Sequence, residues 1–323
     1  MCGIAGIMTA DGIAPESAAL DPMKAALAHR GPDGDAVWTS GDTGLVHTRL
    51  AIIDLETGDQ PLFGPGGAAL VANGEIYNYI ELRAELVDAD FATRSDCEPV
   101  LHYYRHHGLD FAEWLRGMYA LALYDPQERR LVLSRDPFGI KPLYYAVSEQ
   151  SFAFASEPQA LLAAGFGARS LRDRPVSELL QLQFTTGAHV PFEGIERVLP
   201  GETIVIAGGR IVDRRRRAAL PTGAPQRVGE TQALDRLETA LMDSVDVHQR
   251  SDVPYAMFLS GGIDSSAVLA LMARLNDTPV RAYTAGFPGT DVADERGQAR
   301  AMAKSVGAEH VEVTFDATDF WSL

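Results

Sequence analysis

The feature that most constrains this chain is a cysteine directly after the initiator methionine, followed by the residues Gly3-Ile4-Ala5-Gly6-Ile7. Removal of Met1 would leave Cys2 with a thiol and a free α-amino group on one residue, which is a nucleophile with an adjacent base. An α-amine has an unperturbed pKa of about 8, so near neutral pH much of it can accept the thiol's proton. Ile4 and Ile7 would then anchor a buried strand. The plainer interpretation is a small buried apolar residue at the chain start.

Composition excludes several classes of protein. A chain of 323 residues suggests about two domains, and its net charge of -16 argues against a nucleic-acid or membrane partner. The only cysteines, Cys2 and Cys97, form no CxxC pair, which argues against a zinc site or a disulfide framework. Neither a signal peptide nor an apolar stretch long enough for a bilayer is found, so we expect a soluble, cytoplasmic protein. The basic run Arg214–Arg217 is interpreted as a solvated linker.

The first two thirds of the chain are predicted to combine short strands with a few helices. A helix is predicted over 15–28, with Leu20, Met23 and Leu27 on one face. Further helices are expected over 79–87 and after Ser95, which we predict as an N-cap. Strands are expected over 44–54, 68–72, 118–124, 131–134, 142–147 and 152–155, and further antiparallel strands through about residue 212.

Two places in these strands carry chemistry. Arg49 lies among apolar residues, where an unpaired charge is costly, so it forms either a structural ion pair or a fork for a carboxylate ligand. The segment Asn73-Gly74-Glu75 is either a simple hairpin turn or a functional one. In the second case the Asn73 amide and the Gly74 N–H make an oxyanion hole, and Glu75 accepts an ammonium group.

A third group of polar residues shares one helical face. Glu98, His102 and His106 lie at positions i, i+4 and i+8, so a metal site has to be considered. No HExxH motif accompanies them, and we favour an amphipathic face that is exposed to solvent.

The last third reads as a separate domain. Residues 213–229 lack periodicity and predict a linker, and Leu234, Leu237, Leu241 and Val245 predict an amphipathic helix after it. The apolar run 255–259, the turn SGGIDSS at 260–266 and an apolar helix over 267–275 form a strand–turn–helix unit that directs backbone N–H groups at phosphate. It is no Walker A loop, because the Gly-Lys-Ser/Thr ending is missing. Strands over 280–287 and 311–315 with a helix over 295–306 predict a parallel sheet.

Six motifs in order carry a resemblance. They are Met-Cys-Gly-Ile at the start, HRGPD at 29–33, RLAIID at 49–54, NGEIYN at 73–78, SDCE at 95–98 and RDPFGIKPLYY at 135–145. Together they resemble the class II glutamine amidotransferase domain of the N-terminal-nucleophile hydrolases. SGGIDSS resembles the pyrophosphate loop of N-type ATP pyrophosphatases, and the two in this order resemble the glutamine-hydrolysing asparagine synthetases. The resemblance implies an α+β four-layer (αββα) domain over 1–212, a linker over 213–229 and an incomplete α/β parallel-sheet ATP pyrophosphatase domain over 230–323.

The resemblance also implies a role for each matching residue. Cys2 is the nucleophile that forms a γ-glutamyl thioester, and Asn73 and Gly74 form the oxyanion hole. Arg49 holds the glutamine α-carboxylate, while Glu75 and Asp96 hold its α-amino group. The residues expected to bind ATP are Leu259, Ser260, Gly261, Gly262, Asp264, Ser265 and Ser266, with Asp264 also a ligand of Mg²⁺. The expected substrates are glutamine, aspartate and ATP, the products include asparagine, AMP and pyrophosphate, and a homodimer is one option for the assembly.

The chain departs from the family in its length and in the arginine run Arg214–Arg217, and three alternatives to a glutamine-dependent synthetase remain open. The family's synthetase domain continues well beyond the pyrophosphate loop, so we expect this chain, which ends at Leu323, to be a fragment whose glutaminase half alone is complete. One alternative is a related amidotransferase with another acceptor. A second is a non-catalytic module that binds glutamine or a nucleotide, and a third is a degraded fragment without activity. The intact Cys2 argues against relatives that resemble β-lactam synthetases, and SGGIDSS argues against amidotransferases with phosphosugar partners.

Overall fold

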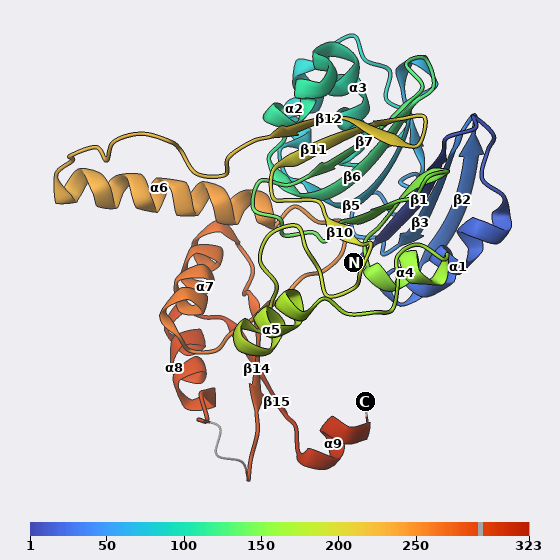
Figure 1. Cartoon of the computed structure of the whole chain (residues 1–323). Coiled ribbons are helices and arrows are strands. Elements are labelled where there is room, and N and C mark those ends of the chain that lie inside the picture. Colours follow the sequence, from blue (N-terminus) through green and yellow to red (C-terminus); the bar gives the residue numbers. More distant parts are fainter. Residues whose placement is uncertain (290–292, 323) are drawn as a thin grey trace. The chain divides into compact units, whose positions relative to one another are not determined.

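The chain divides into two compact units, Met1–Gly223 and Ala224–Leu323 (Figure 1). The structure is a computed structural model, and it describes residues 1–289 and 293–322. Each unit has apolar clusters of its own, and each is described by itself below.

Two six-stranded antiparallel sheets form the first unit. One sheet has the order β10-β8-β9-β1-β3-β2, and the other has the order β12-β11-β7-β6-β5-β4. The strands of the first sheet are β1 (Gly3–Thr9), β2 (Gly34–Ser40), β3 (Thr43–Arg49), β8 (Tyr144–Val147), β9 (Ser151–Ala155) and β10 (Glu196–Arg197). Those of the second are β4 (Leu62–Phe63), β5 (Ala69–Ile76), β6 (Gly117–Asp125), β7 (Arg130–Arg135), β11 (Glu202–Ala207) and β12 (Arg210–Arg216).

Three apolar clusters show how these sheets are layered. One cluster joins β1 and β3 of the first sheet to β5, β6, β7 and β11 of the second, so the sheets pack face to face. The first sheet's other face packs against α1 (Ser17–Leu27) and α4 (Pro158–Ala163), and the second's other face packs against α2 (Tyr79–Glu85) and α3 (Glu98–His107) (Figure 1). The predicted αββα order of layers is therefore present. The helix α5 (Asp173–Leu182) and the short helices η1 (Ala28–Arg30), η2 (Pro65–Gly67) and η3 (Gly108–Trp114) complete the unit.

The first strand occupies the middle of its sheet. β1 pairs with β3 on one side and β9 on the other, and Ile4 and Ile7 are buried as predicted. A side chain at Gly6 would lie within about 2.5 Å of the Gly44 carbonyl oxygen and the Phe154 ring, so only glycine fits there. Because β1 is held on both edges, the position of Cys2 directly before it is fixed.

Most predicted elements of this unit are found, and the face of α1 formed by Leu20, Met23 and Leu27 is buried as predicted. Three boundaries were wrong. β3 ends at Arg49 rather than at Asp54, since Leu50 turns its backbone toward the Cys2 sulfur. β5 continues through Asn73-Gly74-Glu75 in full pairing with β6, so no hairpin turn occurs there. α3 has Cys97 as its N-cap, and the Ser95 hydroxyl instead accepts a hydrogen bond from the Cys97 N–H.

The arginine run is no solvated linker, and the predicted linker therefore starts too early. Arg214, Arg215 and Arg216 belong to β12, which pairs with β11. Arg214 forms an ion pair with Glu202 at 2.7 Å and donates to the Tyr145 hydroxyl at 2.8 Å. The other guanidinium groups of the run bind Asp110, Asp213 and the carbonyl groups of Pro200, Ala112 and Glu113. Carboxylate and carbonyl partners on neighbouring elements explain why four consecutive cations are accommodated here.

The second unit contains the predicted parallel sheet, in the order β13-β14-β15. Its strands are β13 (Met257–Phe258), β14 (Arg281–Gly286) and β15 (Glu309–Thr314), and its helices are α6 (Glu230–His248), α7 (Ile263–Leu275), α8 (Arg296–Val306) and α9 (Ala317–Ser322). α7 begins at Ile263, four residues before the predicted start, with Gly262 as its N-cap. Within α6, three residues of the predicted apolar face are exposed, namely Leu234, Leu237 and Leu241.

Among the described residues, no helix combines the length and the apolar character that crossing a bilayer requires.

Candidate active site

A cavity of about 270 Å³ in the first unit contains all six residues predicted to handle glutamine. Cys2, Arg49 and Asp96 reach it from the ends or flanks of separate elements, and Asn73, Gly74 and Glu75 reach it from β5. The remaining lining residues are Met1, Leu50, Ile52, Ile53, Gly58, Gln60, Ala72, Ser95, Cys97, Met118 and Lys141. The structure thus brings together side chains that are up to 94 positions apart in the sequence (96 minus 2).

The Cys2 thiol lies against the backbone of Leu50. Its sulfur accepts a hydrogen bond from the Leu50 N–H at 3.4 Å and donates to the Leu50 carbonyl oxygen at 3.6 Å. Arg30 donates from Nε to the Cys2 carbonyl oxygen at 2.9 Å, which fixes the backbone. Burial raises the pKa of the Cys2 thiol, although the Leu50 hydrogen bond and the nearby amino terminus and Arg49 oppose it. Burial also lowers the pKa of the α-amine of Met1, the amino terminus of this chain.

Asn73 presents a buried amide whose nitrogen has no hydrogen-bond partner in the described part of the chain. The residue is 1 % exposed and pairs with Ala120 in the β5–β6 ladder. An unpaired buried N–H is costly, so its presence beside a cavity points to an acceptor supplied by a ligand. Gly74 follows Asn73 in the strand. A Cβ atom at Gly74 would lie 2.2 Å from the Met118 carbonyl oxygen, which explains why this residue is glycine.

Arg49 already has two acceptors. Its Nη1 forms an ion pair with the Asp59 carboxylate at 2.6 Å, and its Nη2 donates to the Asp54 carbonyl oxygen. The structural ion pair, one of the two sequence interpretations of Arg49, is therefore confirmed, while the fork for a carboxylate ligand stays a prediction for a residue that lines the cavity. Asp59 was not singled out from the sequence, since nothing in the segment ETGDQ marks one acidic residue over another.

Two carboxylates, Asp96 and Glu75, also line the cavity. Asp96 accepts a hydrogen bond from the Ile76 N–H at 2.7 Å, and Glu75 follows Gly74 in β5. Burial, together with the negative charge of Glu75, raises the pKa of Asp96 to about 6. A cationic ligand group between these carboxylates would relieve the cost of ionising Asp96.

Lys141 is a lining residue to which the sequence assigned no role. It is 6 % exposed, and its ammonium group lies 3.7 Å from the Met1 sulfur. Burial lowers the pKa of Lys141, and the charges of Glu75 and Cys2 oppose that effect. The fully buried Asp136 shapes the loop that carries Lys141, because it accepts hydrogen bonds from the N–H groups of Phe138, Ile140 and Lys141. The motif RDPFGIKPLYY was the available signal for this lysine.

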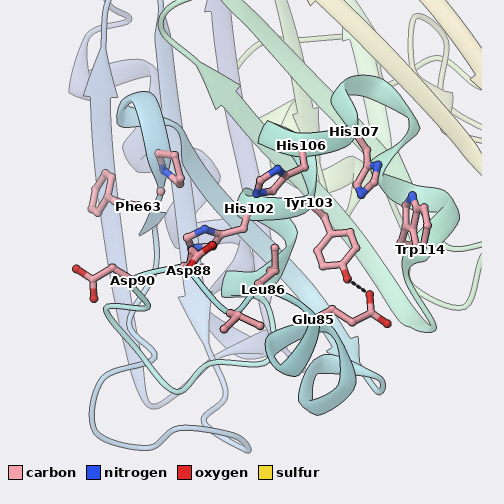
Figure 2. Close-up of a pocket in the computed structure, with 14 residues that line it drawn as sticks. Phe63, Glu85, Leu86, Asp88, Asp90, His102, Tyr103, His106, His107 and Trp114 are labelled. Carbon is pink, nitrogen blue, oxygen red and sulfur yellow. Dashed lines mark hydrogen bonds between the residues drawn. The ribbon is translucent and has the colours of Figure 1, made fainter.

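The metal group that was considered on α3 is not assembled in the described part of the chain. Glu98 is buried and accepts hydrogen bonds from the Ala92 and Thr93 N–H groups and from the Thr93 hydroxyl. His102 and His106 instead line a separate cavity of about 890 Å³ (Figure 2). No group of three or more His, Cys, Asp or Glu side chains in residues 1–289 and 293–322 is placed to hold a metal ion. The favoured alternative, a solvent-exposed face, was also wrong, because Glu98 and His102 are buried.

In the second unit the predicted nucleotide-binding residues follow β13. Ser260 and Ser265 hydrogen-bond to each other through their hydroxyl groups at 3.0 Å, and the Gly262 N–H donates to the Ser260 hydroxyl at 3.3 Å. Asp264, Ser265 and Ser266 lie in the first turn of α7, and Asp264 is exposed. Leu259 differs from the rest. Its side chain is in the core, and its backbone N–H and carbonyl are bonded to Tyr283 and Thr284.

Known proteins resemble both units. Residues 1–216 match the family model described as a glutamine amidotransferase domain, and residues 236–323 match the model described as asparagine synthase. The chain is 36% identical to the putative glutamine-hydrolyzing asparagine synthetase of Mycobacterium tuberculosis (strain H37Rv), covering 99% of this chain and 53% of that protein. It is 33% identical to glutamine-hydrolyzing asparagine synthetase 1 of Bacillus subtilis (strain 168), covering 99% of this chain and 51% of that protein. The chain thus spans about half the length of these curated relatives.

A solved structure shares the fold. Glutamine phosphoribosylpyrophosphate amidotransferase from B. subtilis, solved with ADP and GMP, matches with a TM-score of 0.50 and 19% sequence identity, covering 96% of this chain and 65% of that one. The cavity with the six predicted residues lies within the part of the chain that the amidotransferase model matches. The chain belongs to the glutamine amidotransferase family, and an asparagine synthase segment follows its amidotransferase domain.

Proposed function

We propose that the first unit hydrolyses glutamine to glutamate and ammonia, with Cys2 as the nucleophile after removal of Met1. The observation that carries this proposal is the single cavity lined by Cys2, by one guanidinium and by two carboxylates. An amino-acid zwitterion has one carboxylate and one ammonium, so this set of charges matches the backbone end of glutamine. The side-chain amide would then extend toward the thiol.

In the proposed binding mode Arg49 holds the α-carboxylate, and Glu75 and Asp96 hold the α-ammonium. These contacts position the substrate rather than react with it, and they convert a bimolecular attack into an intramolecular one. Asp96 is protonated in part near its raised pKa, and the ligand's positive charge draws it to the ionised form.

The chemistry proceeds through a thioester. The α-amine of Cys2 takes the thiol proton, and the sulfur attacks the δ-carbon of glutamine. The Asn73 side-chain N–H and the Gly74 backbone N–H stabilise the oxyanion that forms. The carbon–nitrogen bond breaks, the leaving nitrogen takes the proton from the amine, and ammonia departs. Water then attacks the thioester, which releases glutamate and restores the thiol.

For the second unit we propose ATP binding at the loop formed by residues 260–262 and the first turn of α7. Backbone N–H groups at a helix start and the hydroxyls of Ser260, Ser265 and Ser266 suit a pyrophosphate. Asp264 alone supplies one carboxylate, which fits Mg²⁺ only as a cation held jointly with nucleotide phosphates. In the whole protein, ammonia would attack a β-aspartyl-adenylate made from aspartate and ATP to give asparagine.

Replacing Cys2 by alanine tests the nucleophile. We expect the C2A variant to lose glutamine hydrolysis while it keeps glutamine binding and its circular dichroism spectrum, because the charged groups that hold the substrate are unchanged. Intact-mass measurement of the wild-type protein checks the removal of Met1. Hydrolysis that persists in the C2A variant would contradict the assignment.

A further inference from the structure

The guanidinium of Arg49 is occupied by a carboxylate of the chain itself. Asp59 accepts from Nη1 at 2.6 Å, and the Asp54 carbonyl oxygen accepts from Nη2. The side chain of Arg49 is 10% exposed, whereas that of Asp59 is 85% exposed. Arg49 is therefore part of the cavity wall, and Asp59 approaches it from the solvent side.

The backbone around Asp59 is held on both sides. Gly58 donates its N–H to the Asp54 carbonyl oxygen at 3.2 Å, and a side chain there would lie 2.7 Å from Nη2 of Arg49. Gln60 accepts from the Ala72 N–H of β5 at 2.6 Å. Gly58 and Gln60 both line the 270 Å³ cavity. The loop thus stays in place, and the Asp59 side chain can leave Arg49 by turning about its own bonds.

A substrate α-carboxylate needs the same donor. Carboxylates bind guanidinium best through two parallel hydrogen bonds, and Asp59 accepts one N–H of Nη1 while the Asp54 carbonyl oxygen accepts one N–H of Nη2. Within the described part of the chain, Arg49 is the one hydrogen-bonding partner of the Asp59 carboxylate. Two carboxylates beside one guanidinium repel each other, so an arriving α-carboxylate favours the release of Asp59 into solvent.

We propose that the Asp59 carboxylate pairs with Arg49 until the α-carboxylate of the amino-acid substrate displaces it. Through this competition Asp59 sets the affinity of the site for that substrate. This inference rests on the proposed function of the cavity in binding glutamine. Asp59 keeps the guanidinium paired in the empty site, and the substrate has to compete with it. It is a residue that determines affinity and takes no part in bond breaking.

The test compares Asp59→Asn with the wild type. Removing the charge removes the competitor, so we expect KM for glutamine to fall roughly two- to fivefold, the range of an exposed ion pair, with kcat unchanged. The matched control is Glu56→Gln, which removes one charge from the same loop at an exposed residue, and it should leave KM as in the wild type. A KM that is unchanged or raised in D59N would overturn the proposal, since a raised KM means that Asp59 orients Arg49 for the substrate.

Binding separates this inference from the proposed chemistry. Calorimetry of glutamine with the C2A variant and with C2A/D59N measures the dissociation constant without hydrolysis, and we expect the same two- to fivefold decrease. An inactive wild type that still binds glutamine would contradict the proposed role of Cys2. The two dissociation constants would still test the proposed role of Asp59. A C2A variant that binds no glutamine would overturn both. The circular dichroism spectrum of D59N should match that of the wild type, which checks that the variant is folded when KM is measured.

Discussion

At the scale of single residues, the cavity contains charges that the fold accommodates at a cost. Asp96 is 6 % exposed and has a pKa raised to about 6, from an ordinary value of 3.8, by burial and by the charge of Glu75. Between these two pH values the folded protein binds more protons at Asp96 than the unfolded chain does. Asp96 therefore makes stability fall as pH rises from about 4 to about 6, and the loss persists at higher pH.

Replacing Asp96 by asparagine is expected to stabilise the ligand-free protein above pH 7, by up to about 3 kcal/mol, because no buried charge has to be ionised. At pH 4 the two proteins should unfold at similar temperatures. The same variant should bind glutamine more weakly, since one partner of the ammonium group is lost. Thermal unfolding over this pH range checks the stability. The exposed Asp88→Asn serves as control, and equal midpoints of D96N and wild type at pH 8 would refute the argument.

At the scale of elements, β5 determines where the proposed oxyanion hole lies. Successive side chains of a strand alternate between its faces, so Asn73 and Glu75 share one face, and both line the cavity. β6 pairs with β5 from Ala69 to Ile76, which leaves these residues little freedom to move. The strands approach each other closely at Gly74, where a side chain would lie 2.2 Å from the Met118 carbonyl oxygen.

Replacing Gly74 by alanine should therefore force β5 and β6 apart. We expect a loss of about 1–3 kcal/mol in the free energy of unfolding, and a marked loss of glutamine hydrolysis because Asn73 moves with the strand. The matched control is Gly34→Ala in β2, where a side chain meets no atom within 4 Å. Denaturant unfolding and a glutaminase assay measure both effects. A G74A variant as stable and active as G34A would contradict the steric argument.

At the scale of the molecule, each unit has its own apolar core. Three clusters stabilise residues up to 223, and a separate cluster around Leu259, Leu269 and Ala282 stabilises the second unit. Because a ligand stabilises the part of a protein that binds it, glutamine should affect the first unit alone.

Calorimetry of the C2A variant should show two unfolding transitions. Glutamine at 100 times its dissociation constant should raise the midpoint of one transition, corresponding to about 2.7 kcal/mol of stabilisation, and leave the other in place. A single transition, or an equal shift of both, would show that the units unfold together and would contradict this expectation.

Much of the fold follows from patterns that are local in the chain. The spacing of Leu20, Met23 and Leu27 specifies the buried face of α1, and alternating strand and helix segments specify the parallel sheet of the second unit. The six glutamine-site residues were predicted by motif and do lie together, although their roles stay a proposal. Such signals are readable because a helix or strand repeats its side-chain directions at a constant interval.

Other features depend on contacts between distant segments, which no local pattern encodes. The arginine run is part of a strand because Glu202, Asp110 and several carbonyl groups surround it, and His102 is buried although its helix position predicted exposure. Lys141 reaches the cavity because Asp136 folds its loop back toward the start of the chain. The sequence by itself determined the elements and the chemical groups. Only the tertiary structure decided which charges meet, because pairing depends on distances across the fold and not on spacing along the chain.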